Sequence, residues 1–338
     1  TFAGIYFTFV SKGLQFRAIL NFKKNLSDII RDANSNYKGI HPIKLYFTSV
    51  GGMVGLGNIV GISMAIMIGG PGSIFWIIIA SLCGTLIKYC EIYLGVKYRV
   101  QNNQGSFDGG AMYYLQEAFK SKFLSILVSV LTCIYAVEIF QFVVIVDRIE
   151  QGFNINKILI ISILLFVLIY STIGGIRRIA NFCTFFMPLF MLIYILMSLY
   201  IICVNIDQLP NFLKLVINSA FTGHATIGGF AGSSVLLTIY LGMSKAVYSG
   251  DIVIGYDAIV QSETKIANPE KQALLAIYAL LTDTTICLLT AFVIGVTGAW
   301  HQLNSLEASD VISTVFKEYF YFSDFFITLL LLFAAITT

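Results

Sequence analysis

Glycine interrupts the first strongly apolar segment of the chain, and a polar side chain follows directly. Residues 51–61 contain five glycines, with Asn58 among them. Each glycine costs about 1 kcal/mol relative to alanine inside a helix, so we expect the helix to break here. In a bilayer, broken backbone is tolerated where it lines a cavity, and its free amides and carbonyls can bind an anion and a cation. Alternatively, Gly51, Gly55 and Ser63 serve only close helix packing.

Two polar side chains could take part in such chemistry. Asp283 lies between Leu280-Leu281 and Ile286, and a carboxylate in an apolar segment is a functional-site hypothesis by default. It could hold sodium, carry a proton, or form a structural pair with a polar neighbour. Asn58 follows the glycine break, where its side chain could bind a cation or a substrate carboxylate, or cap the second half-helix.

The composition indicates the class of protein that positions these residues. The chain is 57% hydrophobic and 12% charged, with a mean hydropathy of +0.84, which is typical of an all-α polytopic membrane protein. A net charge of +3 gives no reason to expect nucleic-acid binding. The cysteines and histidines lack metal-binding spacing, and no Ser/His/Asp cluster is present, so we expect neither an enzyme nor an organic cofactor. Both ends fall inside apolar segments, and we therefore expect the chain to be truncated at both termini.

The hydropathy pattern predicts one transmembrane domain over residues 1–338, beginning with the tail of one extra helix at 1–10. Eight core helices are expected after it, at 43–69, 73–96, 123–147, 157–174, 182–204, 213–245, 272–298 and 324–338. Residues 246–271 are expected to be a polar connection. Arg177 and Arg178 are expected to mark a turn, and Glu91 is expected to pair with Lys88.

The cations indicate the orientation of these helices. Seven of the 21 lysines and arginines fall within residues 11–44. Placing this segment in the cytoplasm leaves only Arg148, Lys157, Lys214 and Lys317 outside, in agreement with the positive-inside rule. We therefore expect a multi-pass protein of the cell inner (plasma) membrane with a cytoplasmic loop at 11–44.

A second glycine-rich interruption is predicted at residues 223–234, inside the sixth core helix. The two interrupted helices are five spans apart, so the two halves of the chain would have opposite directions in the membrane. Interrupted helices at corresponding positions of two halves are typical of inverted-repeat transporters with a midplane binding site. This correspondence favours a functional role for both breaks.

Several motifs in this order resemble the alanine or glycine:cation symporter family, over essentially the whole chain. They are Val54–Ile59, Gly69–Gly72 with Phe75-Trp76, Lys88–Glu91, Val96–Arg99, Gly109–Tyr114, Gly228–Gly232, and Asp283-Thr284 with Thr290-Ala291. The resemblance implies the five-plus-five inverted-repeat fold of bacterial leucine transporters, with discontinuous first and sixth core helices. It also implies sodium-coupled uptake of small neutral amino acids.

The resemblance and the two breaks together imply a set of binding residues. The substrate would contact Leu56, Gly57, Asn58, Gln141, Gly228, Gly229 and Phe230. Sodium would take carbonyl oxygens of Gly51, Val54 and Ala334 and hydroxyls of Thr337 and Thr338, with Asn58 and Asp283 as further ligands. The two threonines could instead bond back to their own helix.

The chain departs from the family pattern in two places. Leu56 stands where the family usually has threonine, which removes a hydroxyl beside the substrate. Residues 249–255 replace an Asn-Glu-Ala-Gly signature, which bears on gating or coupling.

The leading hypothesis is a sodium-coupled symporter for alanine or glycine that works by alternating access. The alternatives are a proton-coupled carrier using Asp283 and a channel-like membrane protein, although no helix shows a continuous polar face. The expected partners are a small neutral amino acid, Na⁺ and the lipid bilayer, with no nucleic acid and a monomeric state.

Overall fold

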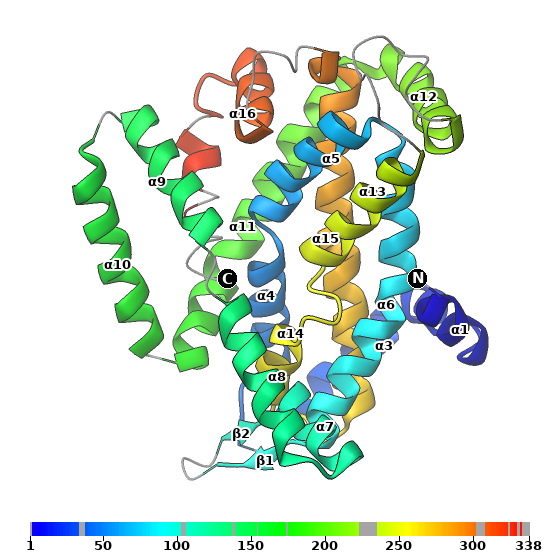
Figure 1. Ribbon diagram of the computed structural model, residues 1–338, viewed down its shortest axis with the longest axis vertical. Helices are drawn as coiled ribbons and strands as arrows, with labels where there is room; N and C mark the ends of the chain where they lie inside the picture. The colour runs from blue at the N-terminus through cyan, green and yellow to red at the C-terminus, as the bar shows by residue number, and fades with distance from the viewer. Residues whose placement is uncertain are drawn as a thin grey trace.

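The computed structural model describes residues 2–33, 38–102, 106–136, 139–153, 155–173, 175–222, 235–301, 308–323, 325–329 and 332. Its centre is formed by α6 (Ser73–Lys97) and α15 (Pro269–Val296), which pack along each other (Figure 1). With 25 residues, α6 is about 37 Å long, enough to cross the roughly 30 Å hydrocarbon core of a bilayer. Together with α11 (Gly175–Val204), these are the three single helices long and apolar enough to span a membrane in the described part of the chain.

A broken helix lies against this centre. It consists of α4 (Pro42–Met53), the π-helix η1 (Gly57–Gly61) and α5 (Ile62–Gly69), and its two halves are bent by 47°. The break falls where the glycine run predicts it. As a bent pair these halves form a further candidate span, so the chain is an integral membrane protein with several apolar helices.

A second broken helix lies beside the first. Helix α13 (Val235–Ser249) ends in the interior, residues 250–255 are not helical, and α14 (Tyr256–Ser262) follows (Figure 1). Because α13 packs on α5 and α14 packs on α4, the two broken helices are antiparallel. The prediction of a polar connection over 246–271 was therefore wrong. Asp251, Asp257 and Gln261 of this stretch are buried, because they form ion pairs with Lys88 of α6 or hydrogen bonds with Ser49 of α4.

The predicted interruption at 223–234 lies outside the described residues, including Gly228, Gly229 and Phe230. On either side of it the structure forms α12 (Leu209–Thr222) and α13, in place of one sixth core helix over 213–245. The short 3₁₀ helix η2 (Ile206–Gln208) joins α11 to α12.

Other predicted boundaries also change. The single span over 123–147 is two helices, α8 (Lys122–Tyr135) and α9 (Ile139–Phe153). Helix α10 (Lys157–Ile173) is followed closely by α11, whose first turn contains Arg177 and Arg178, so these residues mark a helix start and not a turn. The predicted outer loop after α15 contains η4 (Ala299–His301) and α16 (Ala308–Tyr319). Most of the predicted eighth span, including Ala334, Thr337 and Thr338, lies outside the described residues.

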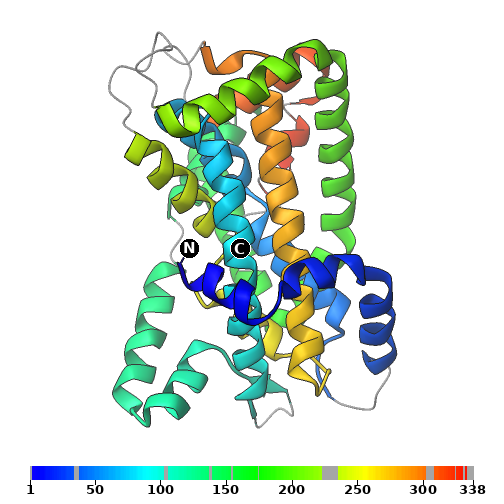
Figure 2. The same ribbon diagram turned by 90° about the vertical axis from the view of Figure 1, so that its right-hand side faces the viewer.

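The N-terminal helices run across the outside of the bundle. Figure 2 shows α1 (Phe2–Val10), α2 (Leu14–Leu20) and α3 (Phe22–Ala33) crossing α6 and α15. At the lower end in Figure 1, the hairpin of β1 (Val100–Gln101) and β2 (Phe107–Asp108) leads into the short helix α7 (Ala111–Phe119). This helix begins within the Gly109–Tyr114 motif.

Small residues allow the central helices to approach closely. A Cβ on Gly72, just before α6, would lie 2.4 Å from the backbone carbon of Ser219 in α12, and one on Gly242 would lie 2.5 Å from the Ser73 carbonyl. Large apolar side chains instead cover the outside, where Phe166 of α10 and Phe185 of α11 are more than two-thirds exposed. In a membrane protein these faces contact lipid, while small residues form helix contacts.

We expect Gly72→Ala to lower the free energy of unfolding by about 1–3 kcal/mol, because the added methyl group meets backbone and not a flexible side chain. The thermal unfolding midpoint in detergent measures this. The matched control is Gly61→Ala, whose Cβ would lie 3.7 Å from its nearest neighbour and should leave the midpoint unchanged or slightly raised. Equal midpoints for the two variants would contradict the close α6–α12 approach.

Candidate substrate and ion site

Asn58 connects the first break to α15. Its Oδ1 accepts a hydrogen bond from the Gly55 N–H (3.0 Å), which closes the turn between α4 and η1. Its Nδ2 donates to Asp283 Oδ1 (2.7 Å) and lies 3.2 Å from Cys287 Sγ. Asn58 is fully buried. The Asn58 amide therefore closes the turn of the break with its oxygen and binds the protein's own Asp283 carboxylate with its nitrogen.

Asp283 receives a second donor from the other broken helix. The Ser249 Oγ, at the last residue of α13, donates to Asp283 Oδ1 (2.8 Å). Three elements thus meet at one buried carboxylate: the start of η1, the end of α13 and the middle of α15. Such a buried carboxylate, with two neutral donors and no lysine or arginine of the described residues at ion-pair distance, is suited to accept a cation or a proton.

The second break is held by a lysine of α6. The Lys88 side chain is completely buried, and its Nζ donates to the carbonyls of Gly250 (2.7 Å) and Asp251 (3.1 Å). These carbonyls follow the C-terminal end of α13, where the helix dipole favours a cation. Lys88 also forms an ion pair with Asp257 (3.1 Å), and Asp251 Oδ2 lies 3.5 Å from its Nζ.

Two acidic side chains complete this cluster. Asp251 Oδ2 accepts a hydrogen bond from the Asp257 N–H (3.0 Å), in the first turn of α14, where a negative charge is favourable. Glu91 Oε2 accepts from the Val253 N–H (3.1 Å). The expected Glu91–Lys88 pair was therefore wrong: Lys88 forms its ion pairs with the aspartates of the second break, which the sequence placed in a polar loop.

The backbone of the second break is strained. Asp251 and Val253 have φ of 47° and 66°, which is the left-handed region that β-branched residues such as valine rarely adopt. Such conformations cost on the order of 1–3 kcal/mol each and persist only where surrounding contacts impose them. The bonds from Lys88 and Glu91 supply those contacts.

The two breaks border one cavity of about 640 Å³, including its open mouth. Its lining comes from the end of α4 and the first break, from α8 and α9, and from the second break: Gly52, Met53, Gly55, Leu56, Gly57, Thr132, Tyr135, Ala136, Gln141, Tyr248, Ser249, Asp251 and Tyr256.

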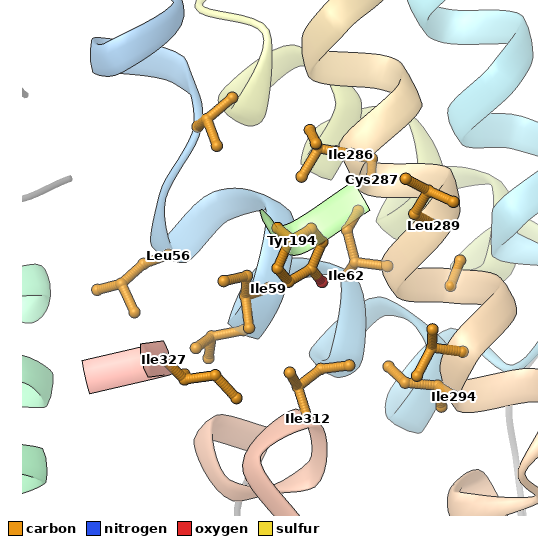
Figure 3. Close-up of a cluster of buried hydrophobic side chains, with 14 of the residues drawn as sticks. Leu56, Ile59, Ile62, Tyr194, Ile286, Cys287, Leu289, Ile294, Ile312 and Ile327 are labelled. Carbon is orange, nitrogen blue, oxygen red and sulfur yellow. The ribbon is translucent and has the colours of Figure 1, made fainter. Parts of the chain in front are cut away.

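Three of the predicted substrate residues, Leu56, Gly57 and Gln141, line this cavity together. Asn58 lies directly behind it. In Figure 3, Leu56 lies at the turn of the unwound chain, away from Tyr194, Ile286 and Cys287. A smaller apolar cavity on that other side is lined by Val54 and Ile59, with Met187, Phe190, Met191, Tyr194 and Ile286.

The predicted sodium ligands are only partly described. Gly51 lies in the last turn of α4 and Val54 directly follows that helix, while Asn58 and Asp283 are in contact. Ala334, Thr337 and Thr338 lie outside the described residues. Among the residues that the structure describes, no group of three or more His, Cys, Asp and Glu side chains is placed to hold a metal ion.

Ser249, Asp251 and Tyr256 line the cavity, and Lys88 pairs with Asp257 behind them, although the local sequence pattern predicts none of these roles. A signal was present: Gly250 and Gly255 flank the break, and charged residues follow an apolar helix immediately. The glycine-rich stretch at 223–234 is a stronger local signal, so the break of the sixth core helix was predicted there and not at 250–255.

The comparison with known families agrees with this geometry. The model of the sodium:alanine symporter family matches residues 1–338. The chain belongs to the sodium:alanine symporter family. The resemblance carried by the motifs, from Val54–Ile59 to Asp283-Thr284, is thereby confirmed.

Curated relatives are named as transporters. The uncharacterized transporter YflA of Bacillus subtilis is 30% identical over the whole chain, which covers 73% of YflA. The probable sodium/glutamine symporter GlnT of the same organism is 31% identical over 88% of the chain and 62% of its own length. The sodium/alanine symporter AgcS of Methanococcus maripaludis is 26% identical over 86% of the chain and 66% of its own length. The chain thus spans slightly less than two thirds of GlnT and AgcS.

We expect Lys88→Met to lower the free energy of unfolding by about 3–5 kcal/mol, because it leaves Asp251 and Asp257 buried without their cation. The double variant Lys88→Met/Asp257→Asn should recover part of this loss, since one of the two charges is removed. Thermal unfolding in detergent measures both, with the exposed Lys23→Met of α3 as the charge-loss control. A Lys88→Met protein as stable as the parent would contradict the assigned role.

Proposed function

We propose that this protein is a secondary symporter that couples sodium entry to the uptake of a small neutral amino acid, alanine or glycine. The observation that carries the proposal is one cavity between two antiparallel broken helices, lined by Leu56 and Gly57 on one side and Ser249 and Asp251 on the other. Membership of the sodium:alanine symporter family supports the same assignment.

The helix ends provide complementary charges for such a substrate. The η1–α5 half-helix begins at the cavity, so its N-terminal amides present a partial positive charge to a carboxylate. On the opposite side, the Asp251 carboxylate lines the same cavity and is suited to a substrate ammonium group. Gln141 from α9 adds a polar contact. A zwitterion therefore matches the cavity better than a neutral solute or an anion.

Sodium would bind where α4 ends. We propose carbonyl oxygens of Gly51, Val54 and Ala334 with hydroxyls of Thr337 and Thr338 for one site, and Asn58 with Asp283 as further ligands. The buried Asp283 carboxylate supports the further ligands, because it has hydrogen-bond donors and, within the described part of the chain, no lysine or arginine at ion-pair distance. The names of GlnT and AgcS include sodium, which agrees with this assignment.

Alternating access would follow from an inverted-repeat fold. The antiparallel arrangement of α4–α5 and α13–α14 supports the five-plus-five architecture, with the discontinuity of the sixth core helix at residues 250–255. We further propose that the protein is a monomer in the plasma membrane. The seven cations of residues 11–44 favour a cytoplasmic position for this segment.

The same buried carboxylate favours a second candidate function. Asp283, whose side-chain hydrogen bonds in the described part of the chain come from the neutral Asn58 and Ser249, is suited to carry a proton, so a proton-coupled carrier is the alternative. One relative of the chain bears the name putative sodium/proton-dependent alanine carrier protein YrbD.

Uptake of radiolabelled alanine into vesicles should require Na⁺ at fixed pH, because sodium would neutralise the site around Asp283. Asp283→Asn should raise the sodium concentration for half-maximal uptake at least about tenfold, since it removes a charged ligand worth more than about 1.4 kcal/mol. Uptake that is driven by a pH gradient and indifferent to sodium would establish the proton-coupled alternative. Glu117→Gln, at an exposed position on α7, is the matched control.

Leu56→Thr should shift substrate selection while sodium dependence remains. Leu56 lines the cavity, and threonine would add both volume to the site and a hydroxyl. One methylene group more or less in a pocket changes the binding free energy by about 1–3 kcal/mol. The relative affinity for serine and for larger side chains should therefore rise by about tenfold or more. Competition by glycine, alanine, serine, valine and leucine in parent and variant measures this. An identical ranking would show that the side chain does not contact substrate.

A further inference from the structure

A second, basic cavity lies away from the broken helices. We define the basic pocket by His41, Lys44, Arg177 and Lys265, which line an open cavity of about 600 Å³ with Gly39, Ile40 and Asn181. It lies at the N-terminal ends of α4 and α11, two helices that pack along each other. Neither the substrate nor the sodium hypothesis uses these residues.

Local backbone structure places these cations together. Residues 40 and 264 form a parallel bridge, in which the Ile40 N–H donates to the Glu263 carbonyl (2.8 Å) and the Lys265 N–H to the Ile40 carbonyl (3.0 Å). This bridge holds Lys265 beside the start of α4. There His41 is the N-cap, and its Nδ1 accepts the Ile43 N–H (3.2 Å), leaving Nε2 able to donate.

The pocket has a strongly positive potential. Lys44 Nζ donates to the neutral Asn181 Oδ1 (2.6 Å), and among the described residues no carboxylate lies within ion-pair distance of Lys44, Arg177 or Lys265. Burial, and then the charges of Lys265 and Lys44, lower the pKa of His41. The N-terminal ends of α4 and α11 add partial positive charge. The basic pocket is therefore suited to bind an anion.

The surroundings of the pocket are those of a membrane surface. Ile173, at the end of α10, and Phe185, about three turns into α11, are more than two-thirds exposed, so these two helices carry apolar surface next to the pocket. Arg178 stacks on Tyr170 at 4.4 Å, an amphipathic pair typical of headgroup level. An anion at this depth would most readily be part of a lipid, since basic pockets between transmembrane helices bind lipid phosphates.

We propose that the basic pocket binds the phosphodiester group of an anionic phospholipid such as phosphatidylglycerol. Lys44, Arg177 and Lys265 surround the phosphate, and the acyl chains lie along the exposed apolar face of α10 and α11. The bound lipid joins three parts of the chain: the first half of the broken helix, the start of α11 and the segment before α15. Its binding does not depend on which solute the protein transports.

The test is lipid binding to the purified protein in neutral detergent, measured by native mass spectrometry. Dioleoyl phosphatidylglycerol and dioleoyl phosphatidylcholine are titrated onto the parent and onto the triple variant Lys44→Gln/Arg177→Gln/Lys265→Gln. The parent should bind phosphatidylglycerol at least about tenfold more tightly than phosphatidylcholine, and the triple variant should lose this preference.

The matched control removes three cations outside the pocket: Lys23→Gln/Lys24→Gln/Arg178→Gln. It should keep the full preference for phosphatidylglycerol. An equal loss in both triple variants would overturn the proposal, because it would show attraction by overall charge. The proposal would also be overturned if inorganic phosphate bound the pocket as tightly as phosphatidylglycerol and displaced it at millimolar concentration. The acyl chains would then add nothing to the affinity, and the pocket would be a free-phosphate site.

Single substitutions keep the proposal testable if the triple variant does not fold. Arg177→Gln lies at an exposed position on α11 and is not expected to disturb folding, and it should weaken phosphatidylglycerol binding several-fold. Lys44→Arg retains the charge and should bind like the parent. If Arg177→Gln elutes as a monodisperse species and binds phosphatidylglycerol with unchanged affinity, the pocket is not the lipid site.

Discussion

The contact between the Lys88 ammonium group and the carbonyls of Gly250 and Asp251 is the constraint on which the rest of the site depends. A fully buried lysine in an apolar helix is tolerated only where acceptors and an opposite charge surround it. An intact helix has no carbonyls to offer, because its own amides occupy them. Lys88 therefore requires the break after α13, and the strained break requires Lys88. Neither feature is stable by itself, which is why a lysine, two aspartates and a left-handed valine occur together.

The first break depends on the second through one carboxylate. Asn58 closes the turn after α4 with its oxygen and uses its amide nitrogen to bind Asp283, and Ser249 reaches the same carboxylate oxygen from α13. A change of charge at Asp283 would alter the hydrogen bonds from Asn58 and Ser249, and so would affect both broken helices at once. This gives a physical route by which ion binding in the centre could alter two half-helices that border the substrate cavity, without a long chain of intermediate contacts.

Local sequence signals located the first break but not the second. Residues 51–61 contain enough glycine to make an unbroken helix unfavourable, so the break at Met53–Gly57 followed from propensity alone. Likewise, Asp283 and Asn58 were recognisable as polar residues in apolar segments, although their direct contact was not. Leu56, Gly57 and Gln141 were assigned with the help of family resemblance, and they line one cavity.

The second break is imposed by tertiary contacts, which a linear pattern does not display. Residues 246–271 read as a polar connection partly because Asp251 and Asp257 are acidic, yet both are buried against Lys88, more than 160 positions earlier in the chain. The division between α8 and α9 has no glycine cluster to mark it, and α16 lies in a segment too short and polar for a membrane span.

Gly57 shows how closely the two breaks are matched. A Cβ at this position would lie 3.3 Å from the Ser249 Cα, tighter than ordinary van der Waals contact, so the two backbones almost touch where the chain is unwound. Evolution at one position is therefore restricted by the other. Any lineage that replaces the glycine with a bulkier residue must displace the end of α13. In a genetic selection, compensating changes for substitutions at position 57 should accumulate in and around residues 248–250, on a segment nearly 200 residues away in the gene.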